Sequence, residues 1–299
     1  MGNDDNKNLI DDNSKSLRRS RFPWLIAIGA GIGAIALIAV FALTAFFIFS
    51  NLTELKNFWK QEQAIVAYDR AIKINPKNDD AWVGKGHALD SLGEYKQALE
   101  AINQAIKINP KNDDAWDGKG TELDALGKHR QAIVAYDRAI KINPKNDDAW
   151  DGKGQALDSL NKYNRALEAV DQAIKINPKN DDAWDGKGNE LDALGKHEQA
   201  IAAYDRSIKI NPKNDDAWDG KGWALDALKK YKQAIAAFDR AIKINPENDD
   251  AWDGKGAELG ALGEYEQAIA AFDRAIKINP GNDDALDGKG AALNALGSH

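Results

Sequence analysis

The stretch Asp113–Asn146 reads DDAWDGKGTELDALGKHRQAIVAYDRAIKINPKN, and it decides the fold because it recurs along the chain every 34 residues. Half a copy precedes the first full copy within residues 51–78, and another half copy closes the sequence over residues 283–299. A fixed period of this length indicates a stack of similar units rather than one globular core. Six full copies fill residues 79–282 and begin at Asp79, Asp113, Asp147, Asp181, Asp215 and Asp249.

Each copy predicts two α-helices. The first begins after an asparagine such as Asn112, which can cap free backbone N–H groups, and two aspartates follow where the helix dipole favours negative charge. It ends at a glycine such as Gly127, which readily adopts the left-handed conformation. Asn161 tolerates that conformation in one copy, and Lys229 should be strained by it in another. The second helix, QAIVAYDRAIKI, ends before Asn-Pro because proline cannot continue the hydrogen-bond ladder.

The apolar side chains of each copy follow helical spacing and lie on one face of each predicted helix. Small residues among them, such as Gly120 and Ala132, allow close packing of neighbouring helices. One helix pair cannot bury these faces alone, whereas stacked pairs can. The sequence therefore predicts an all-α solenoid.

The spaced residues Trp116, Gly120, Ala132, Tyr136, Ala139 and Pro144 resemble the tetratricopeptide repeat family, whose 34-residue pattern has the same residue types at these places. The resemblance implies a right-handed α-solenoid of stacked helix-turn-helix repeats that holds other proteins. It also implies that the first helices line a concave, ligand-facing groove. One departure is systematic, because Lys119 and its counterparts replace the leucine of the family. We expect their stems to lie along apolar surface.

Residues 22–50 predict a transmembrane helix after a short polar tail over residues 1–21. The 27 residues from Pro23 to Phe49 carry no charge, and about 20 apolar residues are enough to cross the hydrocarbon core. The positive-inside rule then predicts a single pass through the cytoplasmic membrane, with the N-terminus in the cytoplasm and the repeats outside. The basic residues that precede the span are Lys15, Arg18, Arg19 and Arg21.

Two alternatives concern the same segment. It could be a cleaved signal peptide, although the apolar stretch of such peptides is usually only about 7 to 15 residues long. Gly29 and Gly33 have the spacing that lets two membrane helices approach closely, so a homodimer through this face is a further prediction.

Composition and motifs exclude several function classes. The chain has no cysteine and a formal net charge of −7, so thiol chemistry is absent and nucleic acid is not expected as a partner. The segment from Asp113 to Asp124 resembles a calcium loop, but Ala115 stands where an EF-hand needs an oxygen ligand. No nucleophile, base and orienting group recur together. We therefore predict no enzyme activity and no cofactor.

The predicted groove lies opposite the apolar arc of each first helix, since successive residues turn by about 100°. Aspartates recur there, and the residue at the centre of the row differs in every full copy. These aspartates could instead serve only to solubilise the surface. We predict that the residues that bind a partner are His87, Asp117, Thr121, Asp124, Asp151, Gln155, Asp158, Asp185, Asn189, Asp192, Asp219, Trp223 and Asp226.

The predicted function is a membrane-anchored scaffold that binds a protein or peptide, basic or extended, in an acidic groove on the extracytoplasmic side. Trp223 is the predicted anchor because it is larger than every counterpart in the row, although drift in one copy would also explain it. The alternative from another class is a surface protein that binds divalent cations through its aspartate rows.

Overall fold

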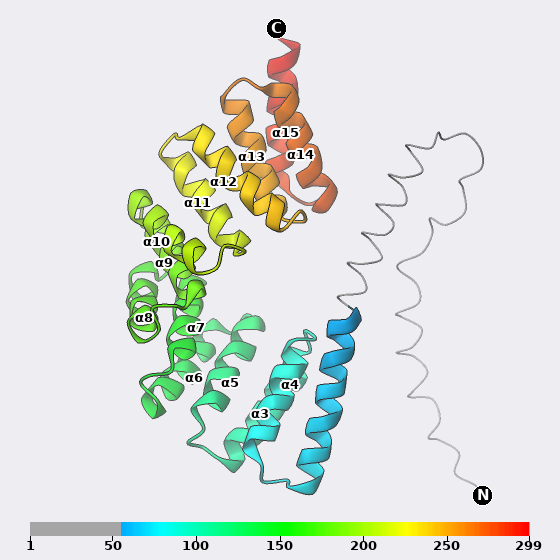
Figure 1. The fold of residues 1–299 in the computed structure, drawn as a ribbon, viewed down its shortest axis with the longest axis vertical. Coiled ribbons are helices and arrows are strands. Elements are labelled where there is room, and N and C mark those ends of the chain that lie inside the picture. Colours follow the sequence, from blue (N-terminus) through cyan, green and yellow to red (C-terminus); the bar gives the residue numbers. More distant parts are fainter. Residues whose placement is uncertain (1–54, 299) are drawn as a thin grey trace, which may run out of the picture. The chain divides into compact units, whose positions relative to one another are not determined.

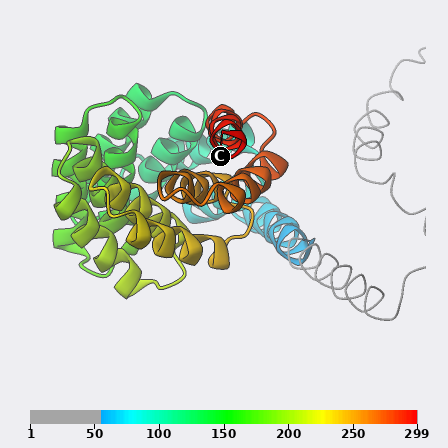
Figure 2. The same cartoon turned by 90° about the horizontal axis from the view of Figure 1, so that it is seen from above.

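The computed structural model describes residues 55–298, and these residues form α-helices joined by short turns. Antiparallel helix pairs follow one another in chain order within the compact unit Phe58–His299 (Figure 1 and Figure 2). This confirms the all-α solenoid, while its handedness and the exact domain limits stay predictions. After a helix over residues 55–74, the helices are α3 (Asp79–Asp90), α4 (Tyr95–Ile108), α5 (Asp113–Ala125), α6 (His129–Ile142), α7 (Asp147–Asp158), α8 (Tyr163–Ile176), α9 (Asp181–Ala193), α10 (His197–Ile210), α11 (Asp215–Ala227), α12 (Tyr231–Ile244), α13 (Asp249–Ala261), α14 (Tyr265–Ile278) and α15 (Asp283–Gly297).

The helix ends follow the predicted capping residues. Asn112 Oδ1 accepts a hydrogen bond from Ala115 N at 3.0 Å, and the equivalent asparagine caps every first helix from α3 to α15. Gly127 has a φ of 70° in the turn between the two helices of its copy. Asn161 and Lys229 take the same left-handed conformation, with φ values of 55° and 57°, as predicted.

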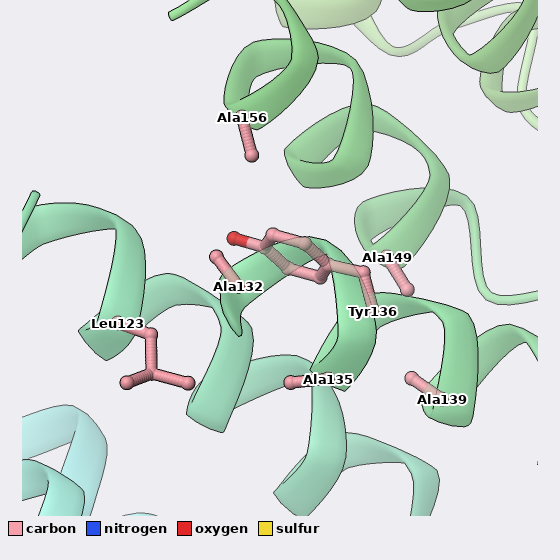
Figure 3. Packing of buried hydrophobic residues seen from close by; sticks show 7 residues of the cluster. All are labelled: Leu123, Ala132, Ala135, Tyr136, Ala139, Ala149 and Ala156. Atoms are coloured by element: carbon pink, nitrogen blue, oxygen red, sulfur yellow. The ribbon is translucent and has the colours of Figure 1, made fainter. Parts of the chain in front are cut away.

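The core lies between helix pairs and combines one bulky side chain with several small ones. Tyr136 of α6 is only 3% exposed and packs among the alanines of its own helix and Ala149 of α7 (Figure 3). A methyl group at Gly120 of α5 or at Gly152 of α7 would collide with the ring of Tyr136. These glycines are therefore required by the close approach of three consecutive helices.

The lysine that departs from the family pattern joins its copy to the one before it, except at Lys119, where Asn103 replaces the aspartate. Lys153 Nζ of α7 lies 2.7 Å from Asp137 Oδ1 of α6 and 5.2 Å from the ring centre of Trp150. Because these groups are partly exposed, we expect each pair to add no more than about 1 kcal/mol. The same ion pair recurs at Lys85–Asp69, Lys187–Asp171, Lys221–Asp205, Lys255–Asp239 and Lys289–Asp273.

A second polar contact ties the end of each copy to its beginning. Asn143 Nδ2 donates to Asp113 Oδ2 at 2.7 Å, and Asn146 Nδ2 donates to the same oxygen at 3.1 Å. Both asparagines follow the second helix, whereas Asp113 begins the first. The first of these bonds recurs at Asn109–Asp79, Asn177–Asp147, Asn211–Asp181, Asn245–Asp215 and Asn279–Asp249.

The predicted half copies at the two ends differ from each other. Residues 55–74 form one continuous helix, which runs through the place where the full copies turn between their two helices. The helix α15 corresponds to the first helix of a copy and is the last helix of the described array.

The predicted localisation is wrong. No helix within residues 55–298 is long and apolar enough to cross a membrane. Helices α3 to α15 have 12 to 15 residues, whereas a membrane crossing takes about 20 apolar ones. The predicted single-pass arrangement, with the N-terminus in the cytoplasm and the repeats outside, is therefore not supported.

The transmembrane helix predicted over residues 22–50 and the dimer contact predicted through Gly29 and Gly33 lie outside the described residues. The helical residues 55–74 carry the charged side chains Lys56, Lys60, Glu62, Asp69, Arg70 and Lys73.

Candidate functional site

The candidate site is the face of the first helices on which two rows of residues run from copy to copy. The ninth place of each copy forms one row, which we call the centre row. Its side chains are exposed except for Trp223, which is half-buried. Residues at the fifth place lie deeper, and we call the four aspartates whose Oδ1 atom is buried without a hydrogen-bond partner the floor aspartates. The centre row is His87, Thr121, Gln155, Asn189, Trp223, Ala257 and Ala291, and the floor aspartates are Asp117, Asp151, Asp185 and Asp219.

The floor aspartates sit between the first helices of neighbouring copies. Asp151 of α7 is 7% exposed, and its Oδ1 would lie 3.9 Å from a methyl group placed on Gly186 of α9. The Oδ1 atom of each of the four floor aspartates is buried and has no hydrogen-bond partner. These atoms are therefore four unsatisfied acceptors at equivalent positions in four consecutive copies.

Burial changes the acidity of this row. It raises the pKa of Asp185 from 3.8 to about 7, and the negative charges of Asp216 and Asp182 raise it further. The pKa values of Asp117, Asp151 and Asp219 are likewise raised to about 7, with burial as the largest cause. A positive charge placed beside these oxygens would reverse the shift by favouring the ionised form.

Some centre-row residues make a hydrogen bond to the floor aspartate of their own copy. Gln155 Nε2 donates to Asp151 Oδ2 at 2.8 Å, since side chains four residues apart lie on the same helix face. The side chain of Trp223 makes the equivalent hydrogen bond to Asp219. One oxygen of each of these carboxylates is thus held while the other is left free.

Aromatic residues of the second helices lie beneath the same rows. The Tyr204 hydroxyl of α10 donates to Asn189 Oδ1 at 2.7 Å. The equivalent residues of α12 and α14 are Phe238 and Phe272, which bring no hydroxyl group. The ring of Trp223 instead meets the ring of Phe238 edge-on, with 5.3 Å between ring centres.

Three of the four aspartates at the twelfth place that the sequence also assigned to the site, all but Asp158, have partners inside the protein. Asp124 Oδ1 lies 2.7 Å from His129 Nδ1, and Asp192 Oδ1 lies 2.7 Å from His197 Nδ1. Asp226 shares a hydrogen bond with Glu258 of the next copy. These carboxylates are less available to a ligand than the floor aspartates.

Sequence reasoning missed three buried glutamates at the tenth place. Glu122, Glu190 and Glu258 are each at most 2% exposed, and one oxygen of each has no hydrogen-bond partner. Burial raises their pKa values to about 8, and the nearby Asp90, Asp158 and Asp226 of the preceding copies raise them further. The available signal was their alternation, because alanine occupies the same place in the copies between them.

Two hollows open on this face and share Trp223 as a wall. The first has a volume of about 600 Å³ and is mainly acidic, with Asp185 and Asp219 among its lining residues. The second has a volume of about 530 Å³ and is mainly apolar, with Ala257 and Phe272 among its lining residues. The predicted anchor therefore stands at the boundary between an acidic and an apolar part of the site.

The described residues of this face do not offer the arrangement of ligands that a cation site needs. Within residues 55–298, no three or more histidine, aspartate or glutamate side chains gather closely enough to hold a metal ion. A calcium site needs about six to eight oxygen ligands around one ion. The floor aspartates are spread one to a copy instead.

Family models described as tetratricopeptide repeat match residues 62–120, 125–189, 186–249 and 250–282. No curated protein matches the chain. Among solved structures, a chain of the APC/C hetero-tetramer Cut9-Hcn1 is 18% identical with a TM-score of 0.73, and the match covers 78% of this chain and 46% of that one.

Two shorter proteins also match. PilF of Pseudomonas aeruginosa is 16% identical with a TM-score of 0.62, and the match covers 70% of this chain and 95% of that one. YrrB, described as a tetratricopeptide repeat protein with an unusual peptide-binding site, is 22% identical with a TM-score of 0.50, and the match covers 64% of this chain and 98% of that one. At these identities the likeness concerns the fold alone.

Proposed function

The chain belongs to the tetratricopeptide repeat family, and we propose that it is a non-catalytic scaffold that holds an extended, basic segment of a partner protein across its first helices. The observation that carries the proposal is the row of floor aspartates, each with one buried oxygen that lacks a hydrogen-bond partner. A buried acceptor without a partner costs about 1–3 kcal/mol. A lysine or arginine side chain of a ligand in the acidic hollow would place a compensating positive charge beside the carboxylates of Asp185 and Asp219.

The arrangement favours an extended ligand. The floor aspartates recur once per copy along the stack, so a compact ligand would meet only one or two of them. Carboxylates also line the acidic hollow between Asp185 and Asp219, and they would repel an acidic segment. We therefore expect this face not to bind acidic tails.

The apolar hollow adds a second requirement. Trp223 lies between that hollow and the acidic one, and its ring is supported by Phe238. Tryptophan is among the commonest residues that dominate binding energy at interfaces. We expect the ligand to present a bulky apolar side chain next to its basic residues.

Peptides selected from a random library on the full chain test this function. We expect enrichment of lysine or arginine together with one aromatic or aliphatic residue, and an affinity that falls as salt rises. Trp223→Ala should weaken binding of the selected peptides at least about 30-fold, which corresponds to about 2 kcal/mol. Asp171→Asn, on the second helix α8, is the matched control and should leave binding unchanged.

Selection of acidic peptides, or equal binding by the Trp223→Ala variant with its helical content intact, would contradict the proposal. Binding that depends on Trp223 but not on salt would restrict the site to the apolar hollow.

A further inference from the structure

The last helix of the described array exposes a face that every equivalent helix buries. Leu293 of α15 is 48% exposed, whereas its six counterparts, such as Leu259 of α13, are at most 5% exposed. Gly290 of α15 has no heavy atom within 4 Å of the place where its side chain would begin. At the same place in α13, Gly256 is covered by the ring of Phe272 from the second helix of its copy. The face of α15 is thus shaped to receive a second helix.

The helix over residues 55–74 exposes the complementary face, that of a second helix without its first helix. Its sequence from residue 61 onward is that of a second helix, and Tyr68 packs against Gly84 of α3 as Tyr136 packs against Gly152 of α7. Ala67 is exposed, whereas its counterparts in α4 to α14 are at most 3% exposed. In the full copies that alanine faces the first helix of its own copy. Residues 55–74 thus expose the face that normally receives a first helix.

The two exposed faces complete each other in register. Helix α15 supplies places 1 to 15 of the 34-residue pattern, and residues 61–78 supply places 17 to 34. We propose that residues 55–74 of one molecule pack on α15 of a second copy of this chain, so that the two molecules complete one helix pair between them. Tyr68 of the first molecule would then cover Gly290 of the second, as Tyr136 covers Gly120 within one chain.

Polar groups at the two ends support the same register. Within the full copies, the aspartate at place 1 accepts hydrogen bonds from asparagines at places 31 and 34, as Asp113 does from Asn143 and Asn146. The equivalent aspartate of α15 is Asp283, and the equivalent asparagines, at the other end of the array, are Asn75 and Asn78. Contact between two molecules therefore brings together a matching donor and acceptor set as well as matching apolar faces.

A contact of this kind is heterologous, since it joins two different surfaces of the molecule. Each molecule keeps one free face after the first contact, so association continues into open chains or closes into a ring. The mode is distinct from ligand binding on the centre row, because neither Leu293 nor Ala67 belongs to that site.

Analytical ultracentrifugation of the full chain over a range of concentrations tests the proposal. We expect the average mass to rise with concentration beyond that of a dimer. Ala67→Arg and Leu293→Arg should each weaken association at least about tenfold, because each places an unpaired charge in the apolar contact. Both residues are exposed in the single molecule, so the helical content of these variants should stay unchanged. Val134→Arg is the matched control in the middle of the array and should associate like the parent protein, since Val134 is 67% exposed.

A mixture of the two blocked variants gives the decisive result. The intact α15 face of the Ala67→Arg chain can still bind the intact 55–74 face of the Leu293→Arg chain, and no other contact remains. The mixture should therefore stop at a dimer, while each variant alone should stay mainly monomeric at the same concentration. Appending a copy of residues 266–282 after His299, which already holds the place of Tyr265, should also prevent association, because a second helix would then cover α15 within the same chain.

A parent chain that stays monomeric at high concentration would overturn the proposal. So would blocked variants that associate like the parent protein, or a mixture that forms no dimer.

Discussion

The site over α5 to α9 and the site over α11 to α15 share one scaffold but present different chemistry. In the first region the centre row is polar, and the hydroxyl group of Tyr204 donates a hydrogen bond to Asn189. In the second region Trp223 and two alanines replace the polar residues, and phenylalanines lie beneath them. The helices, caps and turn positions of the two regions are otherwise alike. Ligand chemistry can therefore be set by the centre row and the aromatic residue beneath it without altering the packing between helices.

The largest effect should come from removing the shared packing. Tyr204→Ala and Phe238→Ala should each cost about 3–5 kcal/mol, because both rings are almost fully buried against glycines of two neighbouring first helices. Chemical denaturation followed by circular dichroism measures the loss. Similar losses are expected in the two regions, and a loss below about 1 kcal/mol in one of them would mean that the regions do not share one core.

The pH dependence of stability should report on the floor aspartates, which both regions share. The folded-state pKa of Asp185 is raised from 3.8 to about 7, so between these values the folded protein holds a proton that the unfolded chain has lost. Stability should therefore fall as pH rises from about 4 to about 7 and change little from this group at higher pH. Asp185→Asn should remove that part of the loss and raise stability at pH 8 by about 1–3 kcal/mol.

Asp171→Asn is the control for this measurement, because Asp171 lies on α8 and is half exposed. A parent protein whose stability is flat from pH 4 to pH 7, or an Asp185→Asn variant that gains nothing at pH 8, would show that the floor aspartates are not buried as described.

A smaller effect should follow from exchanging the hydroxyl group between the regions. Tyr204→Phe should cost about 1 kcal/mol, because it removes the hydrogen bond to Asn189. Phe238→Tyr should also destabilise, since a hydroxyl group placed under the Trp223 ring would have to find a new partner. Thermal unfolding monitors both changes. A stabilised Phe238→Tyr variant would indicate that the apolar region has a polar partner available beneath Trp223.

The smallest effect should come from the turn that follows Trp223. Lys229 has a φ of 57°, and a left-handed residue with a side chain costs about 1 kcal/mol. Lys229→Gly should therefore stabilise the protein by about that amount without altering the site. Glycine already occupies this turn position in the preceding copy, at Gly195. Lys230→Gly is the neighbouring control and should give no gain, because Lys230 has a φ of −91°. Equal stability of Lys229→Gly and the parent protein would show that the strain is relieved elsewhere.

The sequence predicted the fold in detail because each local feature repeats many times. Capping asparagines, turn glycines and the close approach at Gly120 all follow from residue types at fixed spacing. The left-handed conformation of Lys229 was predictable for the same reason. The single helix over residues 55–74 was harder to predict from the sequence, because Leu55 and Phe58 also fit the apolar positions of a separate first helix.

The site was predicted only in outline. Helical spacing places Asp117 and its counterparts on the ligand-facing side, but their burial depends on how closely the next first helix approaches. The sequence of one copy does not indicate that distance, because it depends on how neighbouring copies stack. Glu122 was missed for the same reason, since a glutamate in a helix usually points to solvent.

The number of protons released when a basic peptide binds tests most directly whether the floor aspartates hold the ligand. Isothermal titration calorimetry of a selected lysine-containing peptide at pH 7, in buffers of different ionisation enthalpy, measures this number. A positive charge beside a floor aspartate should lower a pKa that stands at about 7 in the free protein, so binding should release protons, and Asp185→Asn should reduce the release. Binding without any proton release, and with the same affinity in Asp185→Asn, would contradict the claim that the floor aspartates hold the ligand.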